Sequence, residues 1–186
     1  MADTVLVGGG YEGQIIGFSL PAAALKPPAD DGTPREKSPA PIFAFSAHAG
    51  CIRAIACSSR LLATGATDNT LGCYNVRKRR SYGKLVQQEG GGAVCCLRFF
   101  GEGHLISAGE DGELCIWRTS DWECLMRMKG HRAAVHDVAI HPSGRLAISV
   151  AADCVAATAE RGAAASSATA ACTSAASSAA IANAAV

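Results

Sequence analysis

Aromatic residues are scarce in this sequence, and neither sign of charge is in excess. Only 5% of the 186 residues are aromatic, and the formal net charge is +1 at pH 7. A nearly neutral balance gives no electrostatic reason to expect nucleic acid or an anionic membrane as a partner, and no nucleic-acid-binding motif stands out. Hydrophobic residues reach 49%, but alanine contributes much of that share. The core that this chain can build is therefore smaller than the percentage indicates.

Long apolar stretches and paired cysteines are also missing. No run of about 18 strongly apolar residues is present to span a membrane, and no basic segment with an apolar core opens the chain, so we expect neither a membrane partner nor a secretory signal. The nine cysteines are odd in number and include no C-x-x-C pair. Four of them fall in apolar, strand-like runs (Cys73, Cys95, Cys96 and Cys115). This placement favours buried thiols in a reducing compartment over a disulfide framework or a zinc site.

What the sequence does contain is a recurring hairpin pattern. The segment LISAGEDGELCIW (105–117) places two short apolar runs on either side of Gly109-Glu110-Asp111-Gly112. A Gly/Asp-rich connection between two such runs predicts a β-hairpin. The same pattern precedes it by 43 residues and, in a weaker form, by 99 residues. A period of 42–43 residues indicates a repeat architecture in which each unit stacks on the next.

Gly8, Gly10 and Gly13 match the G-x-G-x-x-G pattern of dinucleotide-binding sites. That motif needs a helix after the glycines, within a βαβ unit. The residues that follow are β-like, interrupted by glycine and ended by Pro21. The hairpin interpretation explains the same glycines as turn residues, and a dinucleotide-binding enzyme is kept only as an alternative function.

His131, His136 and His141 raise the question of a metal site. Spacings of five residues place successive histidines on opposite faces of a strand, and each lies in a strand or turn with an explanation of its own. We therefore expect no metal and no cofactor. No Ser/His/Asp or Cys/His set has independent support, so we predict no catalytic residue.

Three segments lie outside the repeat pattern. Residues 21–41 hold six of the seven prolines among charged residues, a composition typical of a surface loop. The run from Arg77 to Arg80 is interpreted as a solvated loop, with a nuclear-import patch as the alternative. Residues 151–186 contain 18 alanines among 36 residues. Without large apolar anchors, the low-complexity tail at 154–186 is expected to be disordered or weakly helical.

The repeat resembles the WD40 family. The resemblance rests on the period, a Gly-His or Ala-His before a unit's first strand, a [ST]-x-x-x-Asp pattern and an aromatic residue six positions after the Asp, and it covers about residues 4–153. In that family each unit forms one four-stranded blade, and a Ser/Thr, an Asp, a His and a Trp link by hydrogen bonds inside it. The resemblance thus implies a structural network made by His48, Thr64, Asp68 and Tyr74; by Ser107, Asp111 and Trp117; and by His131, Ser149 and Asp153.

The units depart from the family pattern in different ways. Tyr74 replaces the tryptophan, Gly91 stands near the position expected for a histidine, and Ala159 stands where the last unit should have its tryptophan. A buried member of such a network that is left unpaired costs about 1–3 kcal/mol. We therefore expect the units to differ in rigidity.

A more specific resemblance is to the WD40 proteins that interact with p21-activated protein kinase (PAK). It rests on four blocks in the same order: GGGYEGQIIGF, ATGATDNTLGCYNV, HLISAGEDGELCIW followed by DWECL, and HPSGRLAISV. This resemblance implies a nucleolar, nuclear scaffold that acts in large ribosomal subunit assembly and negatively regulates a GTPase-activated kinase of the PAK type. Its implied partners are that kinase and pre-ribosomal factors. No motif encodes the kinase-contacting residues, so none is assigned.

Together these observations predict an all-β fold. We expect a partial WD40 β-propeller of about three to four blades over residues 1–153, followed by the Ala/Ser-rich tail. Propellers need about four to eight blades to close a ring, so the terminal blades should expose apolar faces and strand edges. A truncated or mispredicted gene product that is inert and unfolded is the alternative to a functional scaffold.

Overall fold

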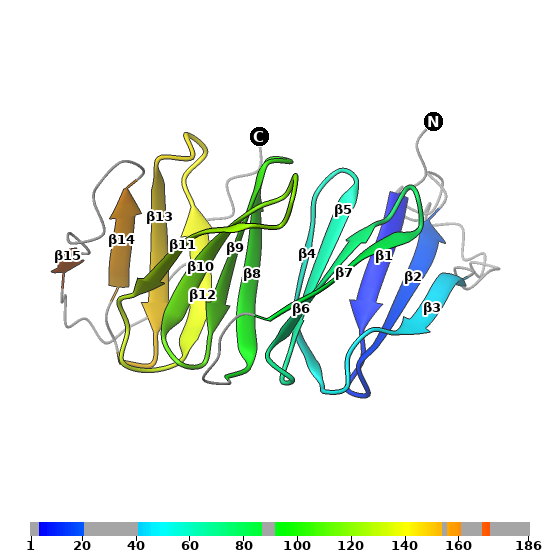
Figure 1. The fold of residues 1–186 in the computed structure, drawn as a ribbon, viewed down its shortest axis with the longest axis horizontal. Helices are drawn as coiled ribbons and strands as arrows, with labels where there is room; N and C mark the ends of the chain where they lie inside the picture. Colours follow the sequence, from blue (N-terminus) through cyan, green and yellow to red (C-terminus); the bar gives the residue numbers. More distant parts are fainter. Residues whose placement is uncertain (1–3, 21–40, 87–91, 154–155, 161–168, 172–186) are drawn as a thin grey trace, which may run out of the picture.

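The computed structural model describes residues 4–20, 41–86, 92–153, 156–160 and 169–171. All regular elements among these residues are β-strands, and they form four separate antiparallel sheets (Figure 1). Across this part of the chain there is no helix with the length and apolar character needed to cross a membrane. The prediction of an all-β fold is confirmed.

The four sheets follow one another in chain order and are called blades 1 to 4. Blade 1 contains β1 (Thr4–Gly9), β2 (Gln14–Leu20) and β3 (Pro41–Ser46). Blade 2 contains β4 (Ile52–Cys57), β5 (Leu61–Ala66), β6 (Thr70–Asn75) and β7 (Arg80–Val86). Blade 3 contains β8 (Val94–Phe100), β9 (His104–Gly109), β10 (Glu113–Arg118) and β11 (Cys124–Lys129). Blade 4 contains β12 (Val135–Ile140), β13 (Leu146–Ala151), β14 (Ala156–Glu160) and β15 (Thr169–Ala171).

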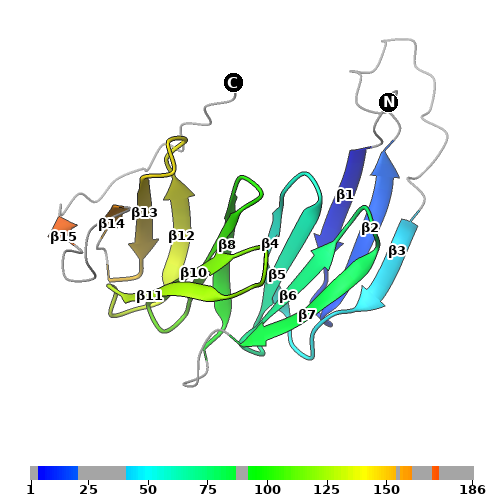
Figure 2. The ribbon, with the colours of Figure 1, turned by 45° about the horizontal axis from the view of Figure 1, so that its top comes forward.

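The blades lie side by side as an open arc. Contacts join β1 to β4, β4 to β8 and β8 to β12, so the first strands of neighbouring blades line the inner side of the arc. Blade 1 and blade 4 lie at opposite ends of the row in both ribbon views (Figures 1 and 2). This arrangement confirms the predicted partial propeller, because the described sheets do not close a ring.

The β1–β2, β5–β6 and β9–β10 turns use a left-handed backbone conformation. Gly112 has φ +80° in the β9–β10 turn, and Gly13 in blade 1 and Asn69 in blade 2 have φ values of +73° and +59°. Glycine adopts this conformation without strain, and asparagine is among the few other residues that tolerate it. The repeat seen in the sequence therefore extends to the backbone of the turn.

The same turn ties blade 1 to blade 2 and blade 3 to blade 4. The Gly13 carbonyl accepts hydrogen bonds from the backbone N–H groups of Ala47 and His48, at 2.8 and 3.1 Å. A Cβ atom on Gly13 would overlap the His48 carbonyl, and one on Gly112 would overlap the His131 carbonyl. Glycine at these turns thus lets the start of the following blade approach the turn closely.

The core consists of three apolar clusters, one at each contact between blades. Ile15, Leu62 and Tyr74 belong to the cluster between blades 1 and 2. The other two clusters lie between blades 2 and 3, around Leu97 and Leu105, and between blades 3 and 4. Many of the buried members are small; they include Ala54, Ala56, Ala63, Ala108 and Ala151. Each blade is therefore stabilised mainly by burying a face against its neighbour, which is the largest favourable contribution to folding.

The tail differs from the sequence-based expectation in two segments. Residues 156–160 and 169–171 are strands β14 and β15, where disorder or weak helix was expected. β14 pairs with β13 over Ala156 to Glu160. The outer edge of β13 has backbone N–H and C=O groups that can pair with another strand whatever side chains that strand carries. Residues 154–155, 161–168 and 172–186 lie outside the described residues, so the expectation for them stays a prediction, as does the expectation of a loop at 21–40.

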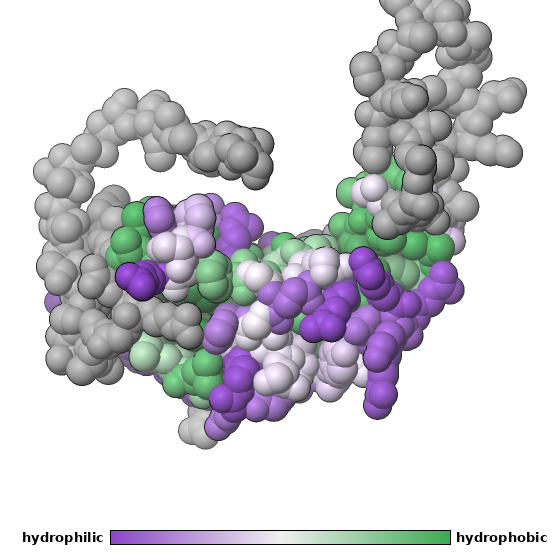
Figure 3. Space-filling model, turned by 90° about the horizontal axis from the view of Figure 1, so that it is seen from above, coloured by the Kyte–Doolittle hydropathy of each residue, from purple (hydrophilic) through white to green (hydrophobic). Residues whose placement is uncertain are grey.

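Apolar side chains are exposed at both ends of the arc. Leu6 of blade 1 is 53% exposed, and Ile148 and Val150 of blade 4 are 48% and 47% exposed. Seen from above, hydrophobic surface gathers towards the two ends of the array (Figure 3). Blade 1 has three described strands, and the 99-residue offset aligns β1 and β2 with β9 and β10, so the counterpart of β8 is absent from the described part of blade 1.

Two glycine substitutions separate backbone strain from contact between blades. Gly101 and Gly112 both have positive φ, but a Cβ on Gly101 would meet nothing within 4 Å. We expect Gly101→Ala to lower the free energy of unfolding by about 1–2 kcal/mol through strain alone. Gly112→Ala should lower it by about 1–3 kcal/mol more, because blade 4 must also move away from the turn. Urea unfolding of the purified variants measures the difference, and equal losses would show that the turn does not hold blade 4.

Candidate functional site

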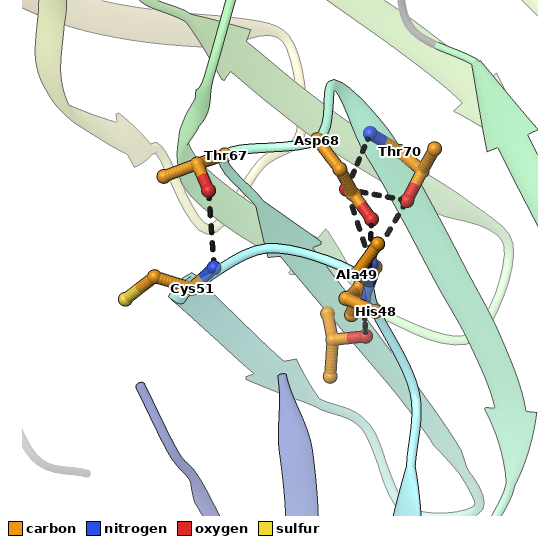
Figure 4. Close-up of polar contacts among 7 residues, drawn as sticks. His48, Ala49, Cys51, Thr67, Asp68 and Thr70 are labelled. Carbon is orange, nitrogen blue, oxygen red and sulfur yellow. Dashed lines mark hydrogen bonds and ion pairs between the residues drawn. The ribbon is translucent and has the colours of Figure 1, made fainter. Parts of the chain in front are cut away.

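A buried histidine is the centre of a polar network in blade 2. The side chain of His48 lies in the segment before β4 and is 3% exposed as a residue. Its Nε2 is 2.8 Å from Thr64 Oγ1 on β5, and its Nδ1 is 2.8 Å from Thr70 Oγ1 and 3.3 Å from Asp68 Oδ1 (Figure 4). Both ring nitrogens therefore have partners, which a buried imidazole needs.

Asp68 joins the β5–β6 turn to the segment that enters β4. Its Oδ2 accepts a hydrogen bond from the Ala49 N–H at 3.0 Å. Its Oδ1 accepts hydrogen bonds from the Thr70 N–H at 3.1 Å and the Thr70 hydroxyl at 2.6 Å. Burial alone would raise the pKa of this carboxyl, but the hydrogen bonds from Thr70 and Ala49, together with His48, lower it. The carboxylate thus acts as a fixed acceptor and not as a proton donor at neutral pH.

Tyr74 completes the network from β6. The tyrosine is 7% exposed, and burial raises its pKa while a side-chain hydrogen bond with Thr64 opposes that rise. A Cβ atom on Gly72 would overlap both the Tyr74 hydroxyl and Thr64 Oγ1. Glycine at position 72 therefore leaves the space through which the tyrosine reaches Thr64.

Blade 3 contains a shorter version of the network. Trp117 Nε1 on β10 donates a hydrogen bond to Ser107 Oγ on β9 at 2.8 Å, and both residues are buried. Asp111 Oδ1 accepts a hydrogen bond from the Glu113 N–H at 3.0 Å, within its own turn. The structure does not link Asp111 to Ser107 or Trp117 through any contact that we can identify. Gly91, at the position expected for a histidine, lies outside the described residues.

Blade 4 has the histidine but not the aromatic residue. His131 Nε2 is 2.8 Å from Ser149 Oγ, and Asp153 Oδ2 accepts a hydrogen bond from the Arg132 N–H at 2.9 Å. His131 Nδ1 lies 3.4 Å from Asp153 Oδ1, which is an ion-pair distance without hydrogen-bond geometry. Ala159 stands on β14 where the tryptophan was expected. The structure thus brings together the predicted groups of blades 2 and 4 and the Ser107–Trp117 pair of blade 3, whereas Asp111 bonds only within its own turn.

The other candidates from the sequence do not form a site in the described residues. Gly8 lies in β1 and Gly13 in the following turn, and strand β2 follows where a dinucleotide site needs a helix. His136 is exposed on β12, and His141 Nδ1 is 2.8 Å from Ser143 Oγ in its own turn. Within the described part of the chain, no group of three or more His, Cys, Asp or Glu residues is placed to hold a metal ion.

The described cysteines are free thiols, and three of them are deeply buried. Burial raises the pKa of Cys73 to about 12, that of Cys115 to about 12 and that of Cys96 to about 11. Such thiols stay protonated near neutral pH and are poor nucleophiles and metal ligands. Cys95 and Cys124, by contrast, are only partly buried and Cys57 is exposed.

The comparison with protein families agrees with this geometry. The family model described as "WD domain, G-beta repeat" matches residues 39–75, 83–118 and 122–156, which together make up more than half of the chain. The chain belongs to the WD-repeat family. Each match begins near the outer strand of one blade and ends at the third strand of the next, and each includes the residues of one polar network.

Curated relatives share the WD repeats of this chain and carry related names. A protein from Gallus gallus named "p21-activated protein kinase-interacting protein 1-like" is 40% identical over 80% of this chain. A protein of the same name from Danio rerio is 36% identical over 82% of it. The chain spans only 37% and 39% of the length of these two relatives. Among solved structures, the computationally designed Ika8 protein superposes with a TM-score of 0.69 at 18% identity, covering 86% of this chain and 44% of that one, which shows the fold.

Two residues of the blade 2 network were not found from the sequence. Thr70 contacts both His48 and Asp68, and Gly72 makes room for Tyr74. The repeat alignment gives no signal for either, because the corresponding residues 43 positions later are Glu113 and Cys115. The tyrosine in place of tryptophan offers a partial clue, since its hydroxyl lies where a Cβ on residue 72 would be.

The Trp117–Ser107 hydrogen bond can be measured by a double-mutant cycle. Ser107→Ala leaves a buried indole N–H without a partner, and Trp117→Phe does the same to the Ser107 hydroxyl, so each is expected to cost about 1–3 kcal/mol. The double variant should lose less than the sum of the two, with a coupling free energy of about 1 kcal/mol. Urea unfolding gives the three values, and fully additive losses would mean that the two groups do not interact.

The buried His48 ring should make the stability depend on pH. Burial lowers the pKa of His48 below its usual value of 6.5, although Asp68 opposes the shift. The unfolded chain therefore binds a proton more readily than the folded one as the pH falls through 6.5, and the free energy of unfolding should decrease from pH 7.5 to 5.5. Urea midpoints across this range should vary less in His48→Gln than in the parent chain. An unchanged slope in the variant would exclude His48 as the cause.

Proposed function

We propose that this chain is a non-catalytic WD-repeat scaffold whose partner is a protein kinase of the p21-activated type. The observation that carries the proposal is the similarity, over about 80% of the chain, to relatives whose names describe them as interacting with p21-activated protein kinase. The chain covers less than two fifths of those relatives, so the kinase interaction of the whole relative is proposed for this shorter chain.

The polar residues support a scaffold more than an enzyme. His48, Thr64 and Asp68 satisfy one another inside blade 2, and His131 and Ser149 do so inside blade 4. A catalytic group has to reach a substrate in a cleft, whereas these side chains are buried within single blades. Their hydrogen-bonding groups pair with one another and hold the hairpins together. The exposed loops and strand edges are therefore the surfaces available for binding a partner.

The proposal also includes the finer roles that the family resemblance implies. These are negative regulation of the kinase, participation in large ribosomal subunit assembly together with pre-ribosomal factors, and a nucleolar location. They rest on the four sequence blocks described above, of which ATGATDNTLGCYNV forms the β5–β6 hairpin of blade 2 and HLISAGEDGELCIW forms the β9–β10 hairpin of blade 3.

Binding to the kinase is the direct test. Purified chain titrated into purified p21-activated protein kinase in a calorimeter should show saturable binding, and it should slow phosphorylation of a peptide substrate by the GTPase-activated kinase. A protein kinase from another class serves as the control partner and should give neither effect. A cooperative thermal transition shows that the purified chain is folded. If such a chain does not bind p21-activated kinase, the proposal is overturned.

A further inference from the structure

A pocket lies between blade 1 and blade 2, and Tyr74 of the blade 2 network forms part of its wall. It has a volume of about 260 Å³ and lies between β3 on one side and β5, β6 and the β6–β7 turn on the other. Its apolar wall comes from two phenylalanines of β3 and from blade 2, and its rim carries two arginines; these residues are Phe43, Phe45, Leu62, Tyr74, Arg79 and Arg80. The strands that carry the pocket can be followed in Figure 1.

The wall of the pocket is aromatic and partly open. The rings of Phe43 and Phe45 lie 6.0 Å apart, and Phe45 meets Tyr74 edge-on at 5.3 Å. Phe45 is nevertheless 39% exposed, so its ring presents apolar surface that a ligand can cover. Pockets for cofactors and other small molecules usually have volumes of about 300–1,000 Å³. A volume below that range favours one inserted side chain over a cofactor.

The rim of the pocket is held in place by the β6–β7 turn. The buried Asn75 accepts a hydrogen bond from the Lys78 N–H at 2.9 Å and donates one from Nδ2 to the Tyr82 hydroxyl at 3.1 Å. Arg79 follows in a left-handed conformation with φ +48°, and β7 begins at Arg80. The turn therefore fixes the backbone from which the two rim arginines extend.

The cations of this turn form no ion pair with a carboxylate in the described residues. Four arginines elsewhere do form such pairs, namely Arg53 with Glu110, Arg60 with Glu102, Arg98 with Asp137, and Arg118 with Asp121 and Glu123, whereas the isolated Arg127, Arg132 and Arg145 do not. The exposed run from Arg77 to Arg80 forms no ion pair within the described part of the chain. Four positive charges thus stand together beside an open aromatic wall.

We propose that this pocket binds an acidic peptide segment of a partner protein. One large apolar side chain of the segment enters the pocket against the exposed part of the Phe45 ring, and carboxylates on the adjacent residues pair with Arg79 and Arg80. Arginine suits this role because its guanidinium donates two parallel hydrogen bonds to a carboxylate. The inference deepens the proposed scaffold function, on which it rests, by naming the chemistry of the segment that the scaffold takes.

Charge complementarity selects this occupant over the alternatives. A neutral apolar ligand would fill the wall but leave the rim cations without partners. Recognition of the basic run as an import signal would use the cations but leave the aromatic wall uncovered. An acidic segment with an apolar anchor satisfies both features, and apolar anchors surrounded by charged pairs are typical of binding hot spots.

A designed peptide tests the pocket directly. The probe is the fluorescein-labelled peptide Gly-Ser-Asp-Glu-Phe-Asp-Glu-Ser-Gly, and its binding to the full 186-residue chain is measured by fluorescence anisotropy. Replacing its Phe by Ala should weaken binding about tenfold or more, because a buried phenylalanine contributes that much. Replacing its Asp and Glu by Asn and Gln should weaken it similarly. Binding should also weaken as salt is raised, since these pairs are exposed.

Substitutions in the chain separate the charges from the wall. The charge reversal Arg79→Glu/Arg80→Glu should weaken binding about tenfold or more, whereas Arg132→Glu/Arg145→Glu in blade 4, its matched control, should not change it. Ser81→Trp places a large ring in the pocket from the exposed start of β7 and should abolish binding. Val86→Trp, at an exposed site on the same strand outside the pocket, is the control.

These experiments decide whether the pocket is the binding site and which ligand occupies it. If the arginine reversal weakens binding but Ser81→Trp does not, the contact is a general attraction to basic surface and the pocket is excluded. Concentration-dependent self-association that the arginine reversal abolishes would assign the pocket to a second copy of the chain and overturn the peptide. The thermal unfolding transition of each variant, unchanged from the parent, shows that lost binding is not lost folding.

The proposal for the pocket and the proposal for the kinase interaction can be disproved independently. If the chain binds the peptide but not the kinase, the proposal for the pocket is supported and the proposed kinase partner is excluded. If the chain binds the kinase equally well with the arginine reversal or Ser81→Trp, and does not bind the peptide, the pocket proposal is overturned. The proposed scaffold function is then unaffected.

Discussion

The structure depends on the packing of one sheet against the next. No blade encloses a core of its own, and the buried apolar residues gather in the three clusters between blades. Small side chains make this contact close, as at Gly65 of β5, where a Cβ would overlap Val94 of β8. The hydrogen bonds within each sheet fix its shape, but the apolar contact between sheets is what stabilises it, as in other stacked-repeat proteins.

The polar networks have a different role from the apolar clusters. They lie within single blades, and in blades 2 and 4 they connect the turn between the second and third strands to the segment that enters the first strand. Blade 2 has partners for both nitrogens of its histidine, whereas blade 3 keeps the Ser–Trp pair and blade 4 keeps the His–Ser pair. Since each network is confined to its blade, a loss in one does not remove a partner from another.

Much of the fold could be predicted from the sequence, because its information is periodic. The 43-residue offset places Thr64, Asp68 and Tyr74 onto the next hairpin, and the strands lie where these offsets put them. The contacts of Thr70 and Gly72 are peculiar to one blade, so no comparison between repeats reveals them. The pocket could not be predicted for a related reason: Phe45 and Tyr74 come from different blades, and only the packing of blade 1 against blade 2 brings their rings together.

Strands β14 and β15 could not be predicted because they depend on an available edge rather than on their own sequence. The alanines and threonine of β14 pair with β13 through the backbone, and β15 pairs with β14 in the same way, so the shape of blade 4 carries little information about which residues form its outer half. That tolerance has a consequence for how such arrays change over time. A repeat whose inner strands carry the specific contacts can have its outer strands replaced by unrelated sequence. The terminal blade of the array can therefore change or lose its outer strands without disturbing the blades nearer the middle.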